Sequence, residues 1–334
     1  MKSFKPKISM VVKSYNGGER LIPTLESCKL QTYQDKELII SDDASPDGIT
    51  PKIIEDWLSE NEHYFKRVVF IKNEVNVGAV KNTRNAVMQT TGDVVFSTTQ
   101  GDLIYGSETI ERISKEIEKQ RLDGLKDPYI WLGHFKSFVM KSGTKTKFYY
   151  PVSTKSDFDL IEKYPDKALE KMKIANFICG VSLIFNSKYY DDNIYPLPKT
   201  MKNLGDYPCL LWNLINKHRI GIIRQFIHWY EYGVGVSSRP NPKLIADMDE
   251  MAIWLSKIDP SIGTAQGKKT HWQRIIREII RPFKQAHKHI HRQIWANKIW
   301  AKIWAKKVEK ESSPSFEEKM FLPQYYPDKP DGIF

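Results

Sequence analysis

Short apolar runs alternate with helical patterns over the first hundred residues. Four runs rich in β-branched residues are predicted to be buried strands, at 8–12, 38–40, 68–71 and 94–96. Helices are predicted after the first three of them, reaching about residue 31 and covering about 50–60 and 78–90. Strands that alternate with helices of about ten to fifteen residues predict right-handed crossovers and a parallel sheet.

The pattern after residue 128 is less regular. Strands are predicted at 129–138 and 174–186, with a lysine-rich loop and a helix between them, then at 220–223 and 226–230. A helix is predicted at 206–216, where Pro208 is tolerated in the first turn. Two prolines near 237–242 indicate a boundary, so we expect a main α/β domain at 1–240, a helical extension at 241–310 and a tail at 311–334.

Polar residues gather directly after the predicted strands. The three clusters are Ser14-Tyr15-Asn16, Asp42-Asp43, and Gln100 with Asp102. Because the carboxyl ends of the strands form the ligand crevice of an open α/β sheet, the clusters are expected to converge on one site. The alternative is that each is an ordinary strand-to-helix turn, in which Asp, Asn and Ser are common.

Composition indicates a folded protein and the cellular compartment in which it works. The chain is 41% hydrophobic, which is enough for a substantial packed core. Its cysteines, Cys28, Cys179 and Cys209, are odd in number and widely spaced, which argues against a disulfide framework and fits a reducing compartment. The first apolar run is too short for a signal peptide, and no run of about eighteen apolar residues occurs. We therefore expect a cytoplasmic protein.

The net charge of +11 belongs to one segment. Residues 267–310 carry thirteen Lys or Arg against two acids, and the rest of the chain balances at 38 of each sign. Residues of one side of a predicted amphipathic helix, apolar except for a histidine, step by four and three along this segment; they are Ile276, Ile280, Phe283, His287, Ile290 and Ile294. Tryptophans and lysines follow up to Lys307.

Three interpretations of this basic segment remain open. Tryptophan opposite lysine is typical of helices that lie in a bilayer interface and are attracted by anionic lipid, so peripheral membrane attachment is favoured. Docking onto the main domain or onto a second subunit is the next alternative. Nucleic-acid binding is disfavoured, because no recognised nucleic-acid-binding motif accompanies the charge.

The polar clusters form part of a larger set of motifs. The set begins with Val11-Val12-Lys13-Ser14-Tyr15-Asn16 and Ser41-Asp42-Asp43-Ala44-Ser45-Pro46-Asp47-Gly48. Asn76-Val77-Gly78, Asn82-Thr83-Arg84-Asn85 and Thr91-Gly92-Asp93 follow in order. Over roughly residues 8–238 the chain resembles the family 2 glycosyltransferases, although Lys13 replaces the proline of the family's first motif. The resemblance implies a GT-A-like catalytic domain: an open, mostly parallel α/β sheet flanked by helices, here with a C-terminal basic amphipathic helical extension.

Two motifs depart from the family pattern. The metal-binding Asp-x-Asp-Asp stretch reads Thr99-Gln100-Gly101-Asp102 here, so the resemblance leaves Asp102 as ligand of a divalent cation, Mg²⁺ or Mn²⁺. Gly101 stands where the family has the acid that holds the ribose. The family's Glu-Asp dipeptide reads Gly205-Asp206, which leaves Asp206 as the catalytic base. Without the resemblance, Asp206 would more often be a helix cap.

The resemblance also implies a nucleotide site. Its expected residues are Ser14, Tyr15, Asn16, Asp43, Asn76, Gly78, Arg84, Gln100 and Gly101. The ring of Tyr15 can stack on a pyrimidine. Asp43 can accept the imide N–H of the base, and Arg84 is suited to the base or the phosphates.

These features together predict a glycosyltransferase. It would move a sugar from a nucleotide donor, expected to be a UDP-sugar, to a saccharide or lipid-linked saccharide acceptor with inversion, as in bacterial surface polysaccharide assembly. It is expected at the inner face of the membrane, where the basic helix would attach it peripherally. The sequence leaves open whether the protein forms an oligomer. The alternatives are a sugar nucleotidyltransferase and a non-catalytic, membrane-bound scaffold with a degenerate site.

Overall fold

The computed structural model describes residues 5–138, 155–174, 176–190, 197–231, 234 and 242–262. Within them an eight-stranded sheet runs in the order β3-β2-β1-β4-β7-β6-β8-β5. The strands are β1 Ile8–Ser14, β2 Lys36–Asp42, β3 Val68–Lys72, β4 Val94–Thr99, β5 Leu103–Ile104, β6 Ile130–Phe138, β7 Leu183–Asn186 and β8 Ile220–Glu231. The helices are α1 Leu21–Lys29, α2 Thr50–Asn61, α3 Ala79–Val87, α4 Thr109–Leu122, α5 Lys155–Lys163, α6 Pro165–Ile174, α7 Asp206–Ile215 and α8 Pro242–Ser256.

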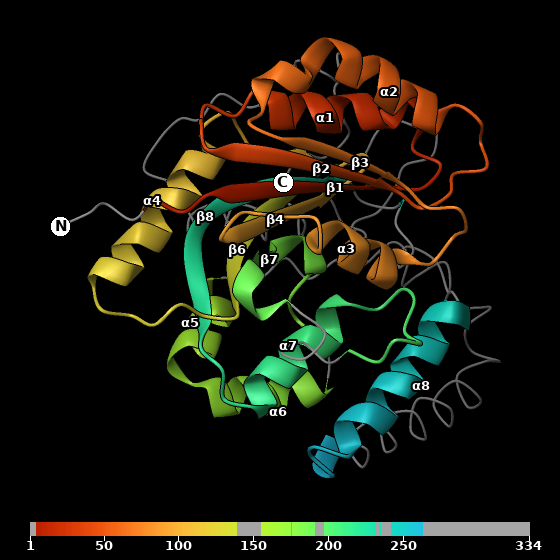
Figure 1. Ribbon diagram of the computed structural model, residues 1–334. Helices are drawn as coiled ribbons and strands as arrows, with labels where there is room; N and C mark the ends of the chain where they lie inside the picture. Colours follow the sequence, from red (N-terminus) through yellow and green to blue (C-terminus); the bar gives the residue numbers. More distant parts are fainter. Residues whose placement is uncertain are drawn as a thin grey trace, which may run out of the picture.

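The first half of the sheet confirms the sequence prediction. β1 pairs in parallel with β2 and β4, and β2 pairs in parallel with β3. Their carboxyl ends, at Ser14, Asp42, Lys72 and Thr99, therefore share one edge of the sheet. Helices α1 and α2 cover one face and α3 covers the other (Figure 1). Crossover helices on both faces are what parallel pairing requires.

The second half is mixed in direction. β7 runs antiparallel to both β4 and β6, β8 runs parallel to β6, and β5 pairs antiparallel with β8. Four of the seven pairings are thus parallel, which agrees with an open, mostly parallel sheet flanked by helices. The sequence pattern did not reveal these antiparallel pairings, nor did it reveal strand β5 and helix α4.

Two predicted strands are corrected by the structure. Of the strand expected at 174–186, only Leu183–Asn186 is extended, because α6 continues to Ile174 and a 3₁₀ turn occupies Gly180–Ser182. The two strands expected at 220–223 and 226–230 form a single strand, β8. Arg224 lies exposed within it, between the two predicted strands, and the register of β8 against β6 shifts near this point.

Apolar side chains pack on both faces of the sheet. On one face, Met10 and Val12 lie in a cluster with α1, α2 and α4. On the other, Val11 packs with Ala86 and Val87 of α3. The alternation of neighbouring β1 residues between the two clusters is the period-two pattern of a strand buried on both sides.

Helix α8 lies beyond the boundary expected at residue 240. Its buried residues Met251 and Leu255, and Ile262 after it, join the same core cluster as Leu210 and Leu211 of α7. The basic part of the extension, from residue 263 on, and the tail lie outside the described residues. The expected domain limits therefore stay predictions. Among the helices that the structure describes, none is both long and apolar enough to cross a bilayer.

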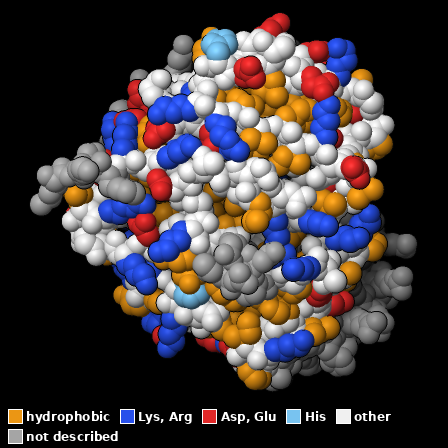
Figure 2. All heavy atoms as spheres, viewed as in Figure 1, with side chains coloured by type: hydrophobic (Ala, Val, Ile, Leu, Met, Phe, Trp, Pro, Cys, Tyr) orange, Lys and Arg blue, Asp and Glu red, His pale blue; other side chains and the backbone are white. Residues whose placement is uncertain are grey.

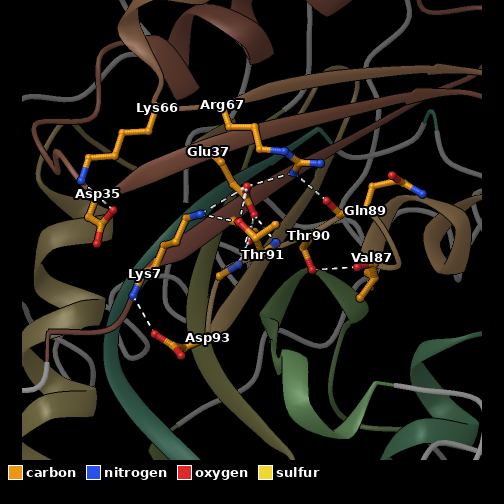
Figure 3. A network of polar contacts seen from close by, with 12 residues as sticks. Lys7, Asp35, Glu37, Lys66, Arg67, Val87, Gln89, Thr90, Thr91 and Asp93 are labelled. Carbon is orange, nitrogen blue, oxygen red and sulfur yellow. Dashed lines mark hydrogen bonds and ion pairs between the residues drawn. The ribbon is translucent and has the colours of Figure 1, made fainter.

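Charged side chains of both signs are interspersed over the face seen in Figure 2. At the amino ends of the parallel strands they form a network around Glu37, whose side chain is fully buried (Figure 3). Its carboxylate accepts hydrogen bonds from the hydroxyls of Ser9 and Thr91, from the backbone N–H groups of Thr91 and Gly92, and from Arg67. Burial alone would raise the pKa of Glu37, but these donors outweigh it and bring the pKa down to about 2.

Candidate active site

A cavity of about 470 Å³ opens beside the carboxyl ends of β1 and β4. Residues of α3 and the amino end of α7 line it from the other side. Asp102 and Asp206, which are far apart in the sequence, both line this cavity. The fold thus brings a carboxylate that follows β4 and a carboxylate that begins α7 to the same cavity.

Asp102 sits in a tight turn after β4. Its backbone N–H donates to the carbonyl of Thr99 at 3.0 Å, and its Oδ1 accepts the backbone N–H of Glu231 at 2.8 Å. The residue is only 8% exposed. Burial raises the pKa of its carboxyl to about 8, against the opposing charges of Lys13 and Arg20.

The place of the missing acid at Gly101 is filled by an ion pair from elsewhere in the fold. Gly101 has φ +89°, and a Cβ atom there would lie 2.3 Å from Oε2 of Glu231 and 2.5 Å from Nη2 of Arg20. Those two side chains pair with each other across this position. A carboxylate is thus present beside Asp102, supplied by β8 rather than by the motif itself.

Asp206 is the first residue of α7, and Gly205 is the N-cap. Its side chain packs against Gly180, where a Cβ atom would lie 3.0 Å from Oδ2. Burial raises the pKa of the Asp206 carboxyl, although the backbone N–H groups of Tyr207 and Gly180 and the charge of Lys13 favour the ionised form. The Asp206 carboxylate therefore contacts backbone groups at the start of α7 and also lines the cavity.

Lys13 also lines the cavity. Lys13 is a half-buried residue whose charge interacts with both Asp102 and Asp206, while burial lowers the pKa of its ammonium. The sequence showed Lys13 only as a departure from the family's proline. Its position at the end of a buried strand was the signal that it points into the site.

The predicted nucleotide-binding residues after β1 form a compact loop outside the cavity lining. Gln100 holds this loop, because its side chain exchanges two hydrogen bonds with the backbone of Tyr15, both 2.6 Å long. Tyr15 is 44% exposed, so its ring is accessible to a ligand. Asn16 has φ +52°, and its N–H donates to the Ser45 hydroxyl at 2.8 Å. The hydroxyl of Ser14 is buried without a partner among the described residues.

Asp43 organises the turn that leads into α3. Its carboxylate accepts the backbone N–H groups of Val77 and Gly78 at 2.8 and 2.9 Å, while Asn76 donates to its backbone carbonyl at 3.2 Å. Gly78 has φ +87°, and a Cβ atom there would lie 2.8 Å from the carbonyl oxygen of Lys202. Only glycine fits this close approach.

Arg84 extends from α3 toward the cavity wall. Its Nη2 donates to the backbone carbonyl of Leu197 at 2.5 Å, and Leu197 itself lines the cavity. The structure thus gathers Asp102, Asp206 and Lys13 on the cavity. Asp43 and Arg84, two of the expected nucleotide ligands, hold the elements around it.

The donor set at Asp102 fits a cation that is shared with a ligand. Among the described residues, no group of three or more His, Cys, Asp or Glu side chains could enclose a metal ion. Mg²⁺ commonly binds through one or two carboxylates together with substrate phosphates. Asp102, with Glu231 beside it, meets that requirement only when a phosphorylated ligand supplies further oxygens.

Comparisons with known proteins find related sequences. The sequence model of "Glycosyl transferase family 2" matches residues 9–190. "Putative glycosyltransferase EpsE" of Bacillus subtilis is 31% identical over 116 residues, which are 35% of this chain and 40% of that protein. "Uncharacterized glycosyltransferase MJ1057" of Methanocaldococcus jannaschii is 26% identical over 271 residues, 80% of each chain.

Solved structures share the fold. A crystal structure of S. aureus TarS in complex with UDP-GlcNAc matches with a TM-score of 0.54 at 18% identity, covering 76% of this chain and 67% of that one. The sheet flanked by helices is therefore the GT-A fold that the motifs implied. On the family match across more than half of its length, this chain belongs to glycosyl transferase family 2.

Proposed function

We propose that the protein transfers a sugar from a UDP-sugar to a saccharide or lipid-linked saccharide acceptor, with inversion at the anomeric carbon. The observation that carries this proposal is that Asp102 and Asp206 line the same cavity. A one-step displacement needs a group that holds the leaving diphosphate, here Asp102 through its cation, and a base for the acceptor, here Asp206, at the same cavity. The fold shared with TarS, which was solved with UDP-GlcNAc, supports a UDP-sugar as donor.

In the proposed reaction Asp206 acts as the base. Its carboxylate takes the proton from the acceptor hydroxyl while that oxygen attacks the anomeric carbon, and the bond from that carbon to the diphosphate oxygen breaks. The electron pair leaves with the nucleoside diphosphate. One displacement without a covalent intermediate inverts the configuration. A raised pKa suits this role, because a stronger base accepts the proton more readily once it is ionised.

The donor's nucleoside would bind at the carboxyl ends of β1 and β2. The exposed ring of Tyr15 is available for stacking on the base, and Gln100 fixes the loop that presents it. Asp43 would contribute both its remaining acceptor capacity and the turn containing Asn76 and Gly78. The other proposed ligands are Ser14, Asn16, Arg84 and Gly101.

Family 2 glycosyltransferases generally use a divalent cation, and we propose Mg²⁺ or Mn²⁺ at Asp102. When bound, the ion would supply positive charge to the diphosphate leaving group. Asp102 would hold it together with donor oxygens, and the Glu231 backbone N–H keeps the Asp102 carboxylate oriented.

A direct test is a donor panel at saturating Mn²⁺ and in EDTA. UDP-sugars and other nucleotide sugars are incubated with the protein, and release of the nucleoside diphosphate is measured with and without saccharide acceptors. We expect release from one or more UDP-sugars, and a product of inverted configuration by NMR. Release of inorganic pyrophosphate from a sugar phosphate and a nucleoside triphosphate would instead indicate a nucleotidyltransferase, and inactivity with every donor would favour a scaffold.

We further propose that the basic segment at 267–310, which lies outside the described residues, attaches the enzyme to the inner face of the membrane, near a lipid-linked acceptor. Each basic residue close to an anionic surface contributes about 1 kcal/mol, screened by salt. Full-length protein should sediment with anionic vesicles at low salt, whereas a truncation before Gly267 should not. Equal sedimentation of the two would favour a docked or oligomer-forming segment.

A further inference from the structure

Lys13 points into the catalytic cavity because of its place on β1. Neighbouring strand residues alternate between faces, and Val11, two residues earlier, packs toward α3. Lys13 lies on that same face, opposite Thr99 of the parallel strand β4. Thr99 and Ser97 of β4 line the cavity alongside Lys13.

The cavity has little positive charge to offer an anionic ligand. Among the described residues that line it, Lys13 is the only Lys or Arg, whereas Asp102 and Asp206 are both acids. Arg20 is near but forms an ion pair with Glu231. A diphosphate that enters this region therefore meets two acidic side chains and one basic side chain, and only the basic one can attract it.

We propose that the Lys13 ammonium binds the diphosphate of the donor and receives the negative charge that builds up there as the bond to the anomeric carbon breaks. This inference rests on the proposed function and adds a ligand to the same site. The donor side is favoured over the acceptor because Lys13 directly precedes the Ser14-Tyr15-Asn16 loop. The ammonium of Lys13 would thus add positive charge next to a metal motif that keeps only Asp102 of the family's acids.

Because the Lys13 ammonium is part of the protein, its effect on ligand binding can be measured without turnover. UDP should bind in EDTA, because Lys13 supplies a charge-assisted hydrogen bond to the phosphates without any metal. Uridine, which has no phosphates, should be indifferent to Lys13. Inorganic pyrophosphate should depend on Lys13 as UDP does, whatever base the natural donor carries.

The experiment is titration calorimetry in EDTA with UDP, uridine and inorganic pyrophosphate. The variants are Lys13→Met and Lys13→Gln, because the amide keeps a polar group beside Asp102 and Asp206 if the thioether variant does not fold. Lys72→Met is the matched control. Lys72 ends β3 at the same edge of the sheet, but it pairs with Glu55 instead of facing the cavity.

We expect the Lys13 variants to bind UDP and pyrophosphate roughly 10- to 100-fold more weakly, with uridine affinity unchanged and Lys72→Met like the wild type. Unchanged UDP affinity, an equal loss for uridine, or no pyrophosphate binding by the wild type would overturn the inference. If pyrophosphate binding depends on Lys13 while UDP does not bind at all, the proposed donor is wrong and the role of Lys13 stands.

Discussion

The two ends of the same parallel strands hold buried carboxylates in opposite environments. Glu37, at the amino ends, is fully buried and has a pKa of about 2 (Figure 3). Asp102, at the carboxyl ends, is nearly as buried and has a pKa of about 8. Burial disfavours the charge in both places. Several donors surround Glu37 and outweigh it, whereas the Asp102 carboxylate accepts the backbone N–H of Glu231 and also meets the like charge of the Glu231 side chain.

The carboxyl ends also contain buried polar groups that the described residues leave unsatisfied. The hydroxyls of Ser14, Ser97, Thr98 and Ser182 have no hydrogen-bond partner there. Buried polar groups are normally paired, and exceptions often mark a functional site. We infer that the amino ends of the strands serve the stability of the protein, and that a ligand would supply the missing partners at the carboxyl ends.

The largest expected effect is on catalysis at the carboxyl ends. Asp206→Asn keeps the shape and a hydrogen-bond acceptor for Gly180, so the fold should survive, but the variant has no base. Transfer should fall by at least ~10²-fold. Initial rates at saturating donor, together with a thermal melt, measure the two effects separately.

A matched control is Asp47→Asn. Asp47 also lies at a helix start, where it accepts the backbone N–H of Thr50 at 3.0 Å, but it is not on the cavity. It should retain the wild-type rate. Near wild-type transfer by Asp206→Asn would place the base elsewhere and leave Asp206 a structural role at the start of α7.

The next largest effect is on stability at the amino ends. Glu37→Gln replaces a charged acceptor by a neutral one and turns an NH₂ group toward the donors of Ser9, Thr91 and Arg67. The free energy of unfolding should fall by about 2–3 kcal/mol in urea titrations at pH 7. Glu55→Gln, at an exposed ion pair with Lys72, should cost less than about 1 kcal/mol. Equal costs would mean that the Glu37 network adds nothing beyond a surface pair.

The pH dependence of the Glu37 contribution has a defined sign. Its pKa in the folded protein lies below the ordinary value of about 4.3, so the stabilisation is complete above that value. It should be lost as the pH falls from about 4.5 toward 2. The corresponding loss should be absent from Glu37→Gln when unfolding is followed at successive pH values.

A smaller effect tests the ion pair that fills the missing acid's place. In Gly101→Ala the alanine is strained by the positive φ, and its Cβ also collides with Arg20 and Glu231. In Gly124→Ala the φ is similar, +76°, but the Cβ meets nothing within 4 Å. Gly124→Ala should cost about 1 kcal/mol of unfolding free energy, and Gly101→Ala about 1–2 kcal/mol more. Equal costs in parallel urea titrations would show that the pair moves aside freely.

The sequence predicted the parallel half of the fold well, because β1 to β4 are short apolar runs with clear helical patterns between them. It failed at 174–186, where Phe177 and Ile178 are buried in an irregular segment whose apolar pattern resembles a strand. Local periodicity reports burial, and cannot distinguish a buried strand from a buried loop.

Motif order placed Asp102 and Asp206 together, since each occupies a fixed position relative to its strand or helix. The ion pair of Arg20 and Glu231 could not be predicted from the sequence, because only the folded chain brings β8 next to the turn before α1. Lys13 was visible as a departure from the family pattern. Its meaning depended on which face of β1 meets the cavity.

The smallest expected effect has the opposite sign to that at Glu37. Asp102→Asn removes a buried charge, and the amide oxygen can still accept the Glu231 N–H. In EDTA at pH 8 the variant should be more stable than the wild type by about 1 kcal/mol, while donor turnover is lost. An acid whose folded pKa is raised loses stability as the pH rises from about 4 toward 8, so the gain should shrink at pH 5. Urea titrations at the two pH values, with Glu37→Gln in the same series, give the comparison. If Asp102→Asn is destabilised as much as Glu37→Gln, then both ends of the strands serve stability alike, and the contrast between them is wrong.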